Sequence, residues 1–250
     1  MCLQRLTVSS LTLNSMPLKW GRDSLSFAII PVKNLRRAKH RLSPLLEEQE
    51  RYLLCLTMFE DVVNALIHSK NLDHIIVITS DNEVLTKAED LGIKTLHDSG
   101  KELNESLTIA TNYCMKMGAK NVTIVPIDIP LIKPEDIDEA ISMDENSEEM
   151  VVISPSKDGF GTNLLFRRPP NIIPTKYGVR SFEKHRKAAL ANNINFRVYK
   201  NPRIALDIDK PEDLIEFIKI GKHTKTFNML QKLHLVEKIK QKFLLFDKSK

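Results

Sequence analysis

The stretch Phe27-Ala28-Ile29-Ile30-Pro31-Val32, which precedes a basic segment at 33–41 and a long helical pattern, decides the fold class. Its uncharged, largely β-branched residues predict a buried strand. Ser43 and Pro44 then predict a helix start, and apolar residues recur at helical spacing from Cys55 to Leu66. A second strand is predicted at 74–79. The same alternation continues from residue 26 to 211, which indicates an α/β protein with a mainly parallel sheet.

The remaining elements follow this alternation. Helices are expected at 81–92, at 103–117, after Pro134, at 181–191 and from Pro211, and strands at 93–96, 121–127, 150–154, 162–166, 196–199 and 204–208. From Asn228 to Phe243 the apolar spacing predicts one amphipathic helix with a lysine-rich outer face. The chain is therefore divided into an N-terminal extension at 1–24, a main domain at 25–221 and a basic amphipathic helix at 222–250.

Composition excludes several classes of protein. With 250 residues, 42% of them apolar, the chain can bury a full core, and no apolar run approaches the roughly 18 residues that a membrane span needs. The three cysteines are far apart and form no metal-binding spacing, which favours a reducing cytoplasm. The first 24 residues contain no apolar run and no cleavage site typical of a secretory signal.

The charge is concentrated at one end of the chain. The formal net charge is +5, and residues 222–250 alone carry a net +6, so the rest is close to neutral. A nucleic-acid binder is expected to spread basic residues over its folded surface and to interleave aromatic residues, which make up only 6% of this chain. The pattern therefore argues against nucleic acid as a partner.

Carboxylates follow two of the predicted strands. Asp128 ends the strand at 121–127, and Asp207 and Asp209 lie two residues apart, so that in an extended segment both project from one face. Ligands collect at the carboxyl ends of strands in open α/β sheets, and a few carboxylates suit Mg²⁺. The other reading is that Asp209, just before Lys210 and Pro211, is a helix N-cap.

The segment 31–44 carries five Lys and Arg residues and no acid. Closely spaced cations repel one another, and a bound polyphosphate would relieve this repulsion through charge-assisted hydrogen bonds. The segment follows the first strand, where the sheet offers a ligand crevice. Neither GxxxxGK[ST] nor GxGxxG occurs, so a P-loop ATPase and a typical dinucleotide-binding fold are disfavoured.

A third cluster joins the segments 158–163 and 177–185, which are rich in small and hydroxyl-bearing residues. Ser181 opens a predicted helix, where its hydroxyl and the free backbone N–H groups suit a phosphate. The other reading is that Ser181 is only an N-cap. His185, one turn further on, is interpreted as a packing or surface residue rather than as a general base.

These residues, in this order, resemble one known family, the 2-phospho-L-lactate guanylyltransferases that help to make the deazaflavin coenzyme factor 420 of methanogens. The resemblance covers about residues 27–220, and the tail after Gly221 lies outside it. It rests on the motifs Ile30-Pro31-Val32-Lys33, 38–42, Leu103-Asn104, Asp128 between prolines, Gly161-Thr162-Asn163, Tyr177-Gly178, Ser181-Phe182, His185, Leu206-Asp207-Ile208-Asp209 and 211–214.

The resemblance implies a three-layer, Rossmann-like mixed sheet of the nucleotide-diphospho-sugar transferase type, with Mg²⁺ as cofactor. By position, the triphosphate would be held by Lys33, Lys39 and Arg41, and the guanine would lie beside Leu103 and Asn104. The metal would be held by Asp128, Asp207 and Asp209, and the acceptor phosphate by Thr162, Gly178 and Ser181. The catalytic residues would be Lys33 and Asp128.

The expected protein is thus a cytoplasmic nucleotidyltransferase of an archaeal methanogen that moves GMP from GTP to 2-phospho-L-lactate. The acceptor phosphate would attack the α-phosphorus in line, without a general base, and diphosphate would leave. One alternative is another acceptor, either phosphoenolpyruvate or a sugar phosphate. An alternative of another class is a non-catalytic binding protein that acts through its basic tail. The apolar stripe of the tail is expected to be buried against the core or a second subunit, and a homodimer is predicted.

Overall fold

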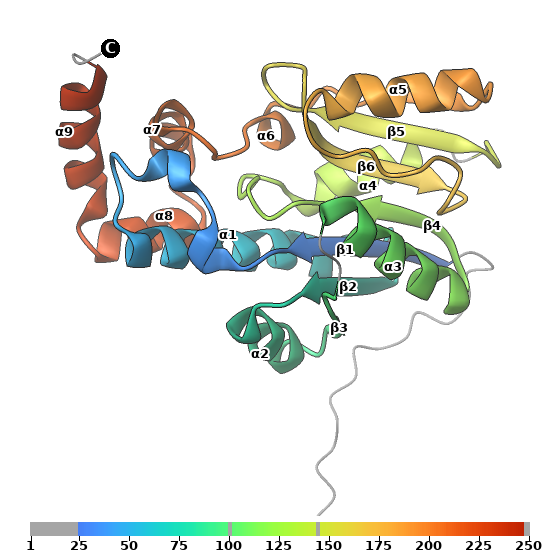
Figure 1. Cartoon of the computed structure of the whole chain (residues 1–250), viewed down its shortest axis with the longest axis horizontal. Helices are drawn as coiled ribbons and strands as arrows, with labels where there is room; N and C mark the ends of the chain where they lie inside the picture. The colour runs from blue at the N-terminus through green and yellow to red at the C-terminus, as the bar shows by residue number, and fades with distance from the viewer. Residues whose placement is uncertain (1–24, 100–101, 144–145, 248–250) are drawn as a thin grey trace, which may run out of the picture.

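A seven-stranded sheet forms the centre of the protein, for which a computed structural model describes residues 25–99, 102–143 and 146–247 (Figure 1). The predicted extension at 1–24 lies outside the described residues. Along the sheet the strands are β3 (Lys94–His97), β2 (His74–Thr79), β1 (Leu25–Val32), β4 (Ala119–Ile124), β6 (Thr162–Arg168), β5 (Met150–Pro155) and β7 (Asn195–Val198).

Most neighbouring strands run parallel, as the sequence predicts. The pairs β3–β2, β2–β1, β1–β4 and β5–β7 are parallel, whereas β6 runs antiparallel to both β4 and β5. The strand β1 is buried on both faces because its side chains alternate between two cores, with Ala28 and Ile30 in one and Phe27 and Ile29 in the other. The carboxyl ends of β1, β2 and β4 therefore meet at one edge of the sheet.

Helices cover both faces of the sheet and complete three layers (Figure 1). One face packs against α1 (Glu48–Ile67), α2 (Asn82–Asp90) and α4 (Pro134–Ser142), and α7 (Pro211–Ile220) extends the same core beyond the carboxyl ends of the strands (Figure 1). The other face packs against α3 (Leu103–Lys116) and α5 (Ser181–Ala191). The three-layer α/β class predicted from the sequence is confirmed.

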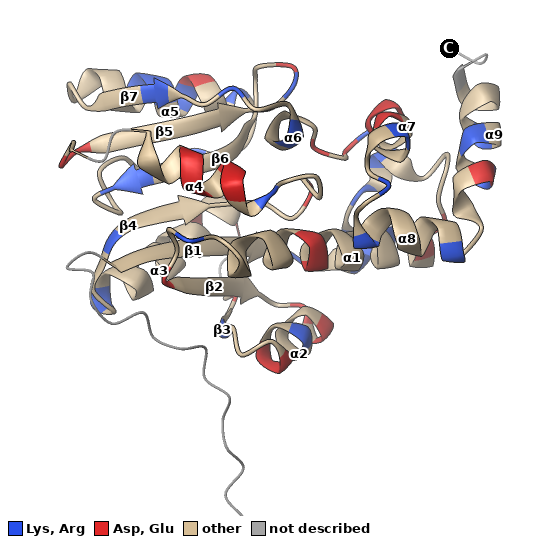
Figure 2. Cartoon of the chain, turned by 180° about the vertical axis from the view of Figure 1, so that it is seen from behind, with Lys and Arg blue, Asp and Glu red and all other residues tan. Residues whose placement is uncertain are grey.

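Two short helices follow, α8 (Lys225–Lys232) and α9 (Leu235–Asp247), where the sequence predicts one continuous helix. That prediction is wrong because the chain reverses at His234, whose φ of 54° no regular right-handed helix adopts. The Asp61 carboxylate of α1 accepts hydrogen bonds from the first backbone N–H groups of α8, and Lys238 of α9 pairs with Glu50. Lys and Arg residues mark both helices in Figure 2, where α8 packs on α1 and α9 packs on α7 and α8.

Two other predicted boundaries differ. The first helix begins at Glu48, not at Pro44, because the preceding segment forms short 3₁₀ turns (Leu35–Arg37 and His40–Leu42) that bury Leu42 and Leu45. The strand predicted at 204–208 is instead the short helix α6 (Pro202–Ala205) and an irregular segment. The Asn201 side chain caps that helix by accepting hydrogen bonds from two backbone N–H groups, with Pro202 at the first helical position.

Candidate active site

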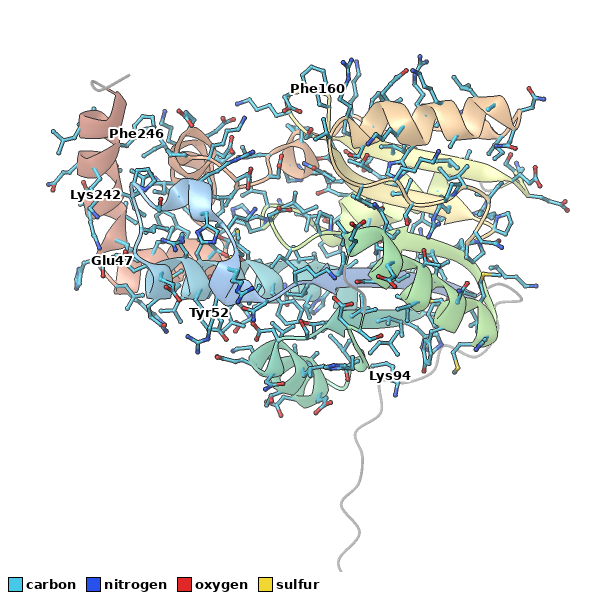
Figure 3. The ribbon with its side chains drawn as sticks, in the orientation of Figure 1. Glu47, Tyr52, Lys94, Phe160, Lys242 and Phe246 are labelled. Atoms are coloured by element: carbon cyan, nitrogen blue, oxygen red, sulfur yellow. The ribbon has the colours of Figure 1, made fainter. Side chains whose placement is uncertain are left out.

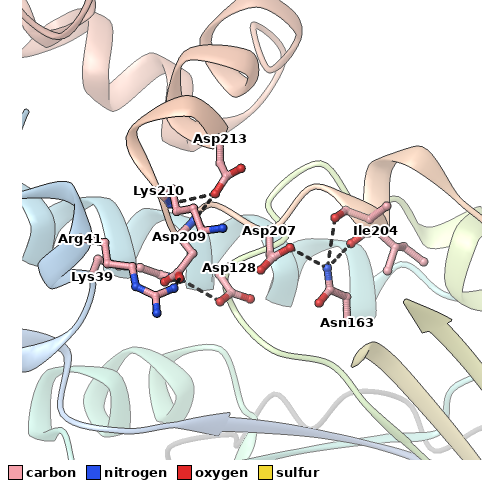
Figure 4. Close-up of polar contacts among 10 residues, drawn as sticks. Lys39, Arg41, Asp128, Asn163, Ile204, Asp207, Asp209, Lys210 and Asp213 are labelled. Atoms are coloured by element: carbon pink, nitrogen blue, oxygen red, sulfur yellow. Dashed lines mark hydrogen bonds and ion pairs between the residues drawn. The ribbon is translucent and has the colours of Figure 1, made fainter. Parts of the chain in front are cut away.

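Three aspartates gather at the carboxyl edge of the sheet. Asp128 follows β4, and Asp207 and Asp209 lie between α6 and α7. The backbone N–H of Ile208 donates to the carbonyl oxygen of Asp128 at 2.8 Å, which holds the two segments together (Figure 4). Asp128 is thus a neighbour in space of Asp207 and Asp209, although these two residues follow a short helix and not the predicted strand.

Two cations of the basic loop pair with these carboxylates. The Lys39 Nζ lies 2.8 Å from Oδ2 of Asp128 and 3.6 Å from Oδ1 of Asp209, and the Arg41 guanidinium lies 2.6 Å from Oδ2 of Asp209 (Figure 4). Burial disfavours the Lys39 ammonium, but the carboxylates of Asp128 and Asp209 outweigh it and raise the pKa of Lys39 to about 12. Lys39 is thus a fixed positive charge among the aspartates.

Asp209 is not the N-cap of α7, which was the other reading of this residue. The N-cap is Lys210, and the backbone N–H groups of Asp209 and Lys210 donate to the carboxylate of Asp213. The Asp209 side chain therefore does not cap the helix and points instead to Lys39 and Arg41 (Figure 4).

Asp207 faces a different neighbour. Its Oδ1 accepts a hydrogen bond of 3.1 Å from the Asn163 side-chain amide, which also donates to the backbone of α6 (Figure 4). The strand pairing skips Asn163, since Ser154 pairs with Leu164 and Pro155 with Thr162. This bulge turns Asn163 toward Asp207. Burial and the nearby Asp128 carboxylate raise the pKa of Asp207.

The carboxylates of Asp128, Asp207 and Asp209 have the chemistry to bind a hard cation, although they do not form a complete metal site. Over residues 25–99, 102–143 and 146–247, no group of three or more His, Cys, Asp or Glu side chains is close enough to hold a metal ion. Burial, and then repulsion from Asp128, nevertheless raise the pKa of Asp207, and a divalent cation would relieve that repulsion. Carboxylate oxygens suit Mg²⁺, which needs only one or two of them when a phosphate supplies further ligands.

Lys33 contacts a different carboxylate from the ones that Lys39 contacts. Its Nζ donates to Oδ2 of Asp98 at 2.7 Å and to the hydroxyl of Ser106 at 2.8 Å, and Ser106 donates to Oδ1 of Asp98 at 2.6 Å. Sequence reasoning missed Asp98 and Ser106. Asp98 directly follows β3, so the strand-end argument applied to Asp128 was also available for it. The basic loop therefore contacts both the aspartates and the start of α3.

Asn104, expected beside the guanine, connects α3 to the loop before α5. Its amide donates to the carbonyl of Tyr177 at 3.1 Å and its carbonyl accepts from the Tyr177 N–H at 2.8 Å. Leu103 packs against the core on the same side of the sheet. The structure thus places both residues at the start of α3, with the polar groups of Asn104 already paired to backbone.

Thr162, Gly178 and Ser181 converge at the N-terminus of α5. The N–H of Ser181 donates to the carbonyl of Gly178, whose φ of 116° suits glycine, and the Thr162 hydroxyl lies 3.1 Å from Nδ1 of His185, one turn along the helix. The N-cap of α5 is Arg180, so the reading of Ser181 as an N-cap is wrong. Ser181 is instead the first residue of the helix.

One open cleft of about 1220 Å³ joins the aspartates to this helix end. Arg180 and Phe160 stand on its rim, with the guanidinium 5.5 Å from the ring centroid, and Figure 3 labels Phe160 at the tip of the turn between β5 and β6. The lining residues include Arg41, Gly161, Gly178, Asp207, Asp209 and Lys210. A cleft with carboxylates and cations at one end and a helix N-terminus at the other suits the joining of two phosphate compounds.

This arrangement defines the chain as a nucleotidyltransferase in class. Its fold is similar to a protein assigned to the nucleotide-diphospho-sugar transferases from Desulfovibrio desulfuricans G20, with a TM-score of 0.71 at 16% identity over 88% of this chain and 98% of that one. The model of the family described as "Guanylyl transferase CofC like" matches residues 26–244. The chain belongs to this guanylyltransferase family.

Curated relatives agree with the family. A 2-phospho-L-lactate guanylyltransferase from Methanobrevibacter smithii is 38% identical over 84% of this chain and 91% of its own length. A phosphoenolpyruvate guanylyltransferase from Rubrobacter xylanophilus is also 38% identical, over 75% of this chain and 91% of its own length. The family match extends to residue 244, so it includes α8 and most of α9, which the sequence analysis left outside the resemblance.

In the described part of the chain, no helix has the length and apolar character needed to cross a membrane.

Proposed function

We propose that the protein transfers GMP from GTP to the phosphate of 2-phospho-L-lactate, giving lactyl-diphospho-guanosine and diphosphate. The observation that carries this proposal is the single cleft that joins the Asp207 and Asp209 carboxylates and Arg41 to the N-terminus of α5. Membership of the guanylyltransferase family supports the nucleotide, and the M. smithii relative supports the acceptor.

The residues of the cleft suit an in-line displacement between two anions. Arg41, which lines the cleft, would neutralise the triphosphate together with Lys33 and Lys39 of the same segment. The backbone N–H groups at the start of α5, with Thr162 and Ser181, would bind the acceptor phosphate. The acceptor phosphate is already an anion, so the attack requires no general base. Catalysis then consists of aligning two groups that repel each other.

Asp128, Asp207 and Asp209 are the residues that would hold Mg²⁺. When bound, the ion would neutralise charge on the phosphates of the nucleotide as diphosphate leaves. The raised pKa of Asp207 is consistent with this assignment, because burial and the neighbouring Asp128 both disfavour its negative charge, and a cation would stabilise that charge.

Phosphoenolpyruvate is the second candidate acceptor. The R. xylanophilus relative that carries this name is as similar to the chain as the M. smithii relative. The two acceptors share a carboxylate and a phosphate and differ in the saturation of the carbon skeleton, so the same cationic cleft suits both.

Measurement of diphosphate release tests the function. The full chain is assayed with phospholactate, phosphoenolpyruvate or phosphoglycerate against each of the four nucleoside triphosphates, and the highest kcat/KM is expected for GTP with phospholactate. Asp128→Asn should abolish turnover and Asp90→Asn, an exposed residue of α2, should retain it. No release with any pair would refute the function, and a maximum with phosphoenolpyruvate would select the second acceptor.

Calorimetric titration of GTP tests the metal separately. With wild-type protein, binding should be stronger in the presence of Mg²⁺ than in its absence, and Asp128→Asn should remove that difference. Equal affinities in all four arms would refute the metal site.

We also infer a homodimer in the cytoplasm. The Leu244 and Leu245 side chains of α9 are 63% and 71% exposed, and a second subunit would cover this apolar surface. Cys55 and Cys114 are unpaired thiols, which favours the reducing cytoplasm. Light scattering after gel filtration tests the dimer. A monomer in the wild type, or an unchanged dimer in Leu244→Glu, would contradict it.

A further inference from the structure

His185 connects the two walls of the candidate acceptor site. The ring is fully buried on α5, with Nδ1 3.1 Å from the Thr162 hydroxyl of β6 and Nε2 accepting the backbone N–H of Lys176 at 2.8 Å. Lys176 precedes Tyr177 and Gly178 in the loop that leads to α5. One imidazole therefore contacts a strand, a loop and its own helix.

The two contacts determine where the proton of the ring lies. A backbone N–H is only a donor, so Nε2 must present its lone pair to Lys176. Burial, and the positive charges of Arg167 on β6, Lys176 in the loop and Lys184 on α5, lower the pKa of His185 to about 4. At neutral pH the ring therefore holds one proton, on Nδ1, and donates it to the hydroxyl oxygen of Thr162.

This donation orients the Thr162 hydroxyl. An oxygen that accepts a hydrogen bond from Nδ1 must direct its own proton elsewhere, as a donor. The N-terminus of α5 begins one turn before His185 at Ser181, so both hydroxyl residues lie against the same helical turn. A hydroxyl that is fixed as a donor is already oriented to bind an anion, whereas a freely rotating hydroxyl must first be oriented.

We propose that His185 is a positioning residue of the acceptor site, where it fixes the Thr162 hydroxyl as a donor to the acceptor phosphate and holds the 176–178 loop in place. The proposal rests on the proposed function for the identity of the anion. The state of the imidazole itself does not, because it follows from the contacts with Thr162 and Lys176. Structure and activity therefore test the two parts separately.

The first experiment reads the imidazole directly. Two-bond ¹⁵N–¹H correlation spectra of the full chain distinguish the two neutral tautomers, and comparison with His185→Asn assigns the resonance among the seven histidines of the sequence. We expect the Nδ1–H tautomer and no titration between about pH 5.5 and 8. An Nε2–H tautomer, or titration near the ordinary pKa of histidine, would overturn the proposal whether or not the protein transfers GMP.

The second experiment separates the two contacts. In His185→Asn the amide nitrogen takes the place of Nδ1 and keeps a donor for Thr162, whereas in His185→Gln the amide oxygen takes the place of Nε2 and keeps only the acceptor for Lys176. With GTP and the acceptor that gives turnover, His185→Gln should raise the acceptor KM about tenfold or more, the usual effect of one hydrogen bond to a charged group. His185→Asn should raise it clearly less, and the KM for GTP should stay unchanged in both.

Thr162 provides the matched control. Thr162→Val should reproduce the loss of His185→Gln, and Thr162→Ser, which keeps the hydroxyl, should raise the acceptor KM less than Thr162→Val. Equal losses in His185→Asn and His185→Gln that affect GTP and the acceptor alike would show a purely structural role and overturn the proposal. An unchanged acceptor KM in His185→Gln or in Thr162→Val would overturn it as well.

Discussion

Replacement of Lys39 by methionine should make the stability of the protein depend on magnesium. Lys39 is the positive charge that contacts Asp128 and Asp209, and its side chain is only 10% exposed. The substitution keeps a side chain of similar length in the buried position and removes the charge. Asp128 then loses its cationic partner, and only Arg41 remains paired with Asp209, so a divalent cation would supply the missing counter-charge.

The structure sets the size of this effect. The carboxylates raise the pKa of Lys39 from 10.5 to about 12, which corresponds to ~2 kcal/mol of stability. The folded pKa lies above the unfolded one, so this contribution is complete below pH 10.5 and is lost as the pH rises through about 12. For a chain of this size, ~2 kcal/mol lowers the Tm by ~4–8 °C.

Differential scanning calorimetry at neutral pH, with and without millimolar MgCl₂ and without nucleotide, measures the effect. Lys39→Met should melt below the wild type without metal and recover part of the difference with it, whereas wild-type protein should respond less because Lys39 already pairs with Asp128 and Asp209. Lys157→Met is the control, since Lys157 lines the same cleft but pairs with Glu216 and is 60% exposed. An equal response of the wild type and Lys39→Met to MgCl₂ would refute the reasoning.

Three further predictions concern the supports of the site. Asp136→Asn should lower the free energy of unfolding by ~2–3 kcal/mol, because the buried carboxylate pairs with Arg203. Since the pKa of Asp136 is lowered in the folded protein, the difference in unfolding free energy between wild type and variant should be present at pH 7 and should disappear as the pH falls below 3.8, as measured by urea titration. Gly161→Ala should raise the acceptor KM without changing that for GTP, because a Cβ would lie 2.6 Å from the Ser156 hydroxyl oxygen, and an unchanged acceptor KM would contradict this. Asp61→Ala should speed amide exchange at the first turn of α8, while exchange in α5 stays unchanged, because the carboxylate accepts hydrogen bonds from that turn.

The strands and the location of the site could be predicted from sequence because both follow from burial. A strand covered on both faces is a continuous apolar run, as in β1, and polar residues that end such runs are placed at the sheet edge. Asp128 was found in this way, whereas Asp207 and Asp209 were placed from a strand that the structure does not contain and reach the same edge because Ile208 hydrogen-bonds to Asp128. Asn201 followed by Pro202 is a helix-start signal, but the apolar and polar residues at 204–208 alternate as in a strand, so the sequence predicted a strand where α6 lies.

The partners of the cations could not be predicted. Lys39 meets Asp128 across 89 residues of sequence and Lys33 meets Asp98 across 65, and no local pattern specifies which acid a lysine reaches. The same holds for Asn104, whose pairing with the backbone of Tyr177 depends on how a loop packs against α3. The sequence pattern brought both lysines and Asp128 to one edge of the sheet but did not predict their pairing.

That pairing has a consequence for how a nucleotide enters. Lys39 and Arg41 are the counter-ions of the aspartates and also the residues that suit a triphosphate, so nucleotide binding must exchange their partners. Arg41 is 67% exposed and its pair with Asp209 lies near solvent, where such pairs contribute at most ~1 kcal/mol. Lys39 is 10% exposed and held by two carboxylates. The exchange should therefore begin at Arg41, and Lys39 should leave Asp128 only when another cation takes its place.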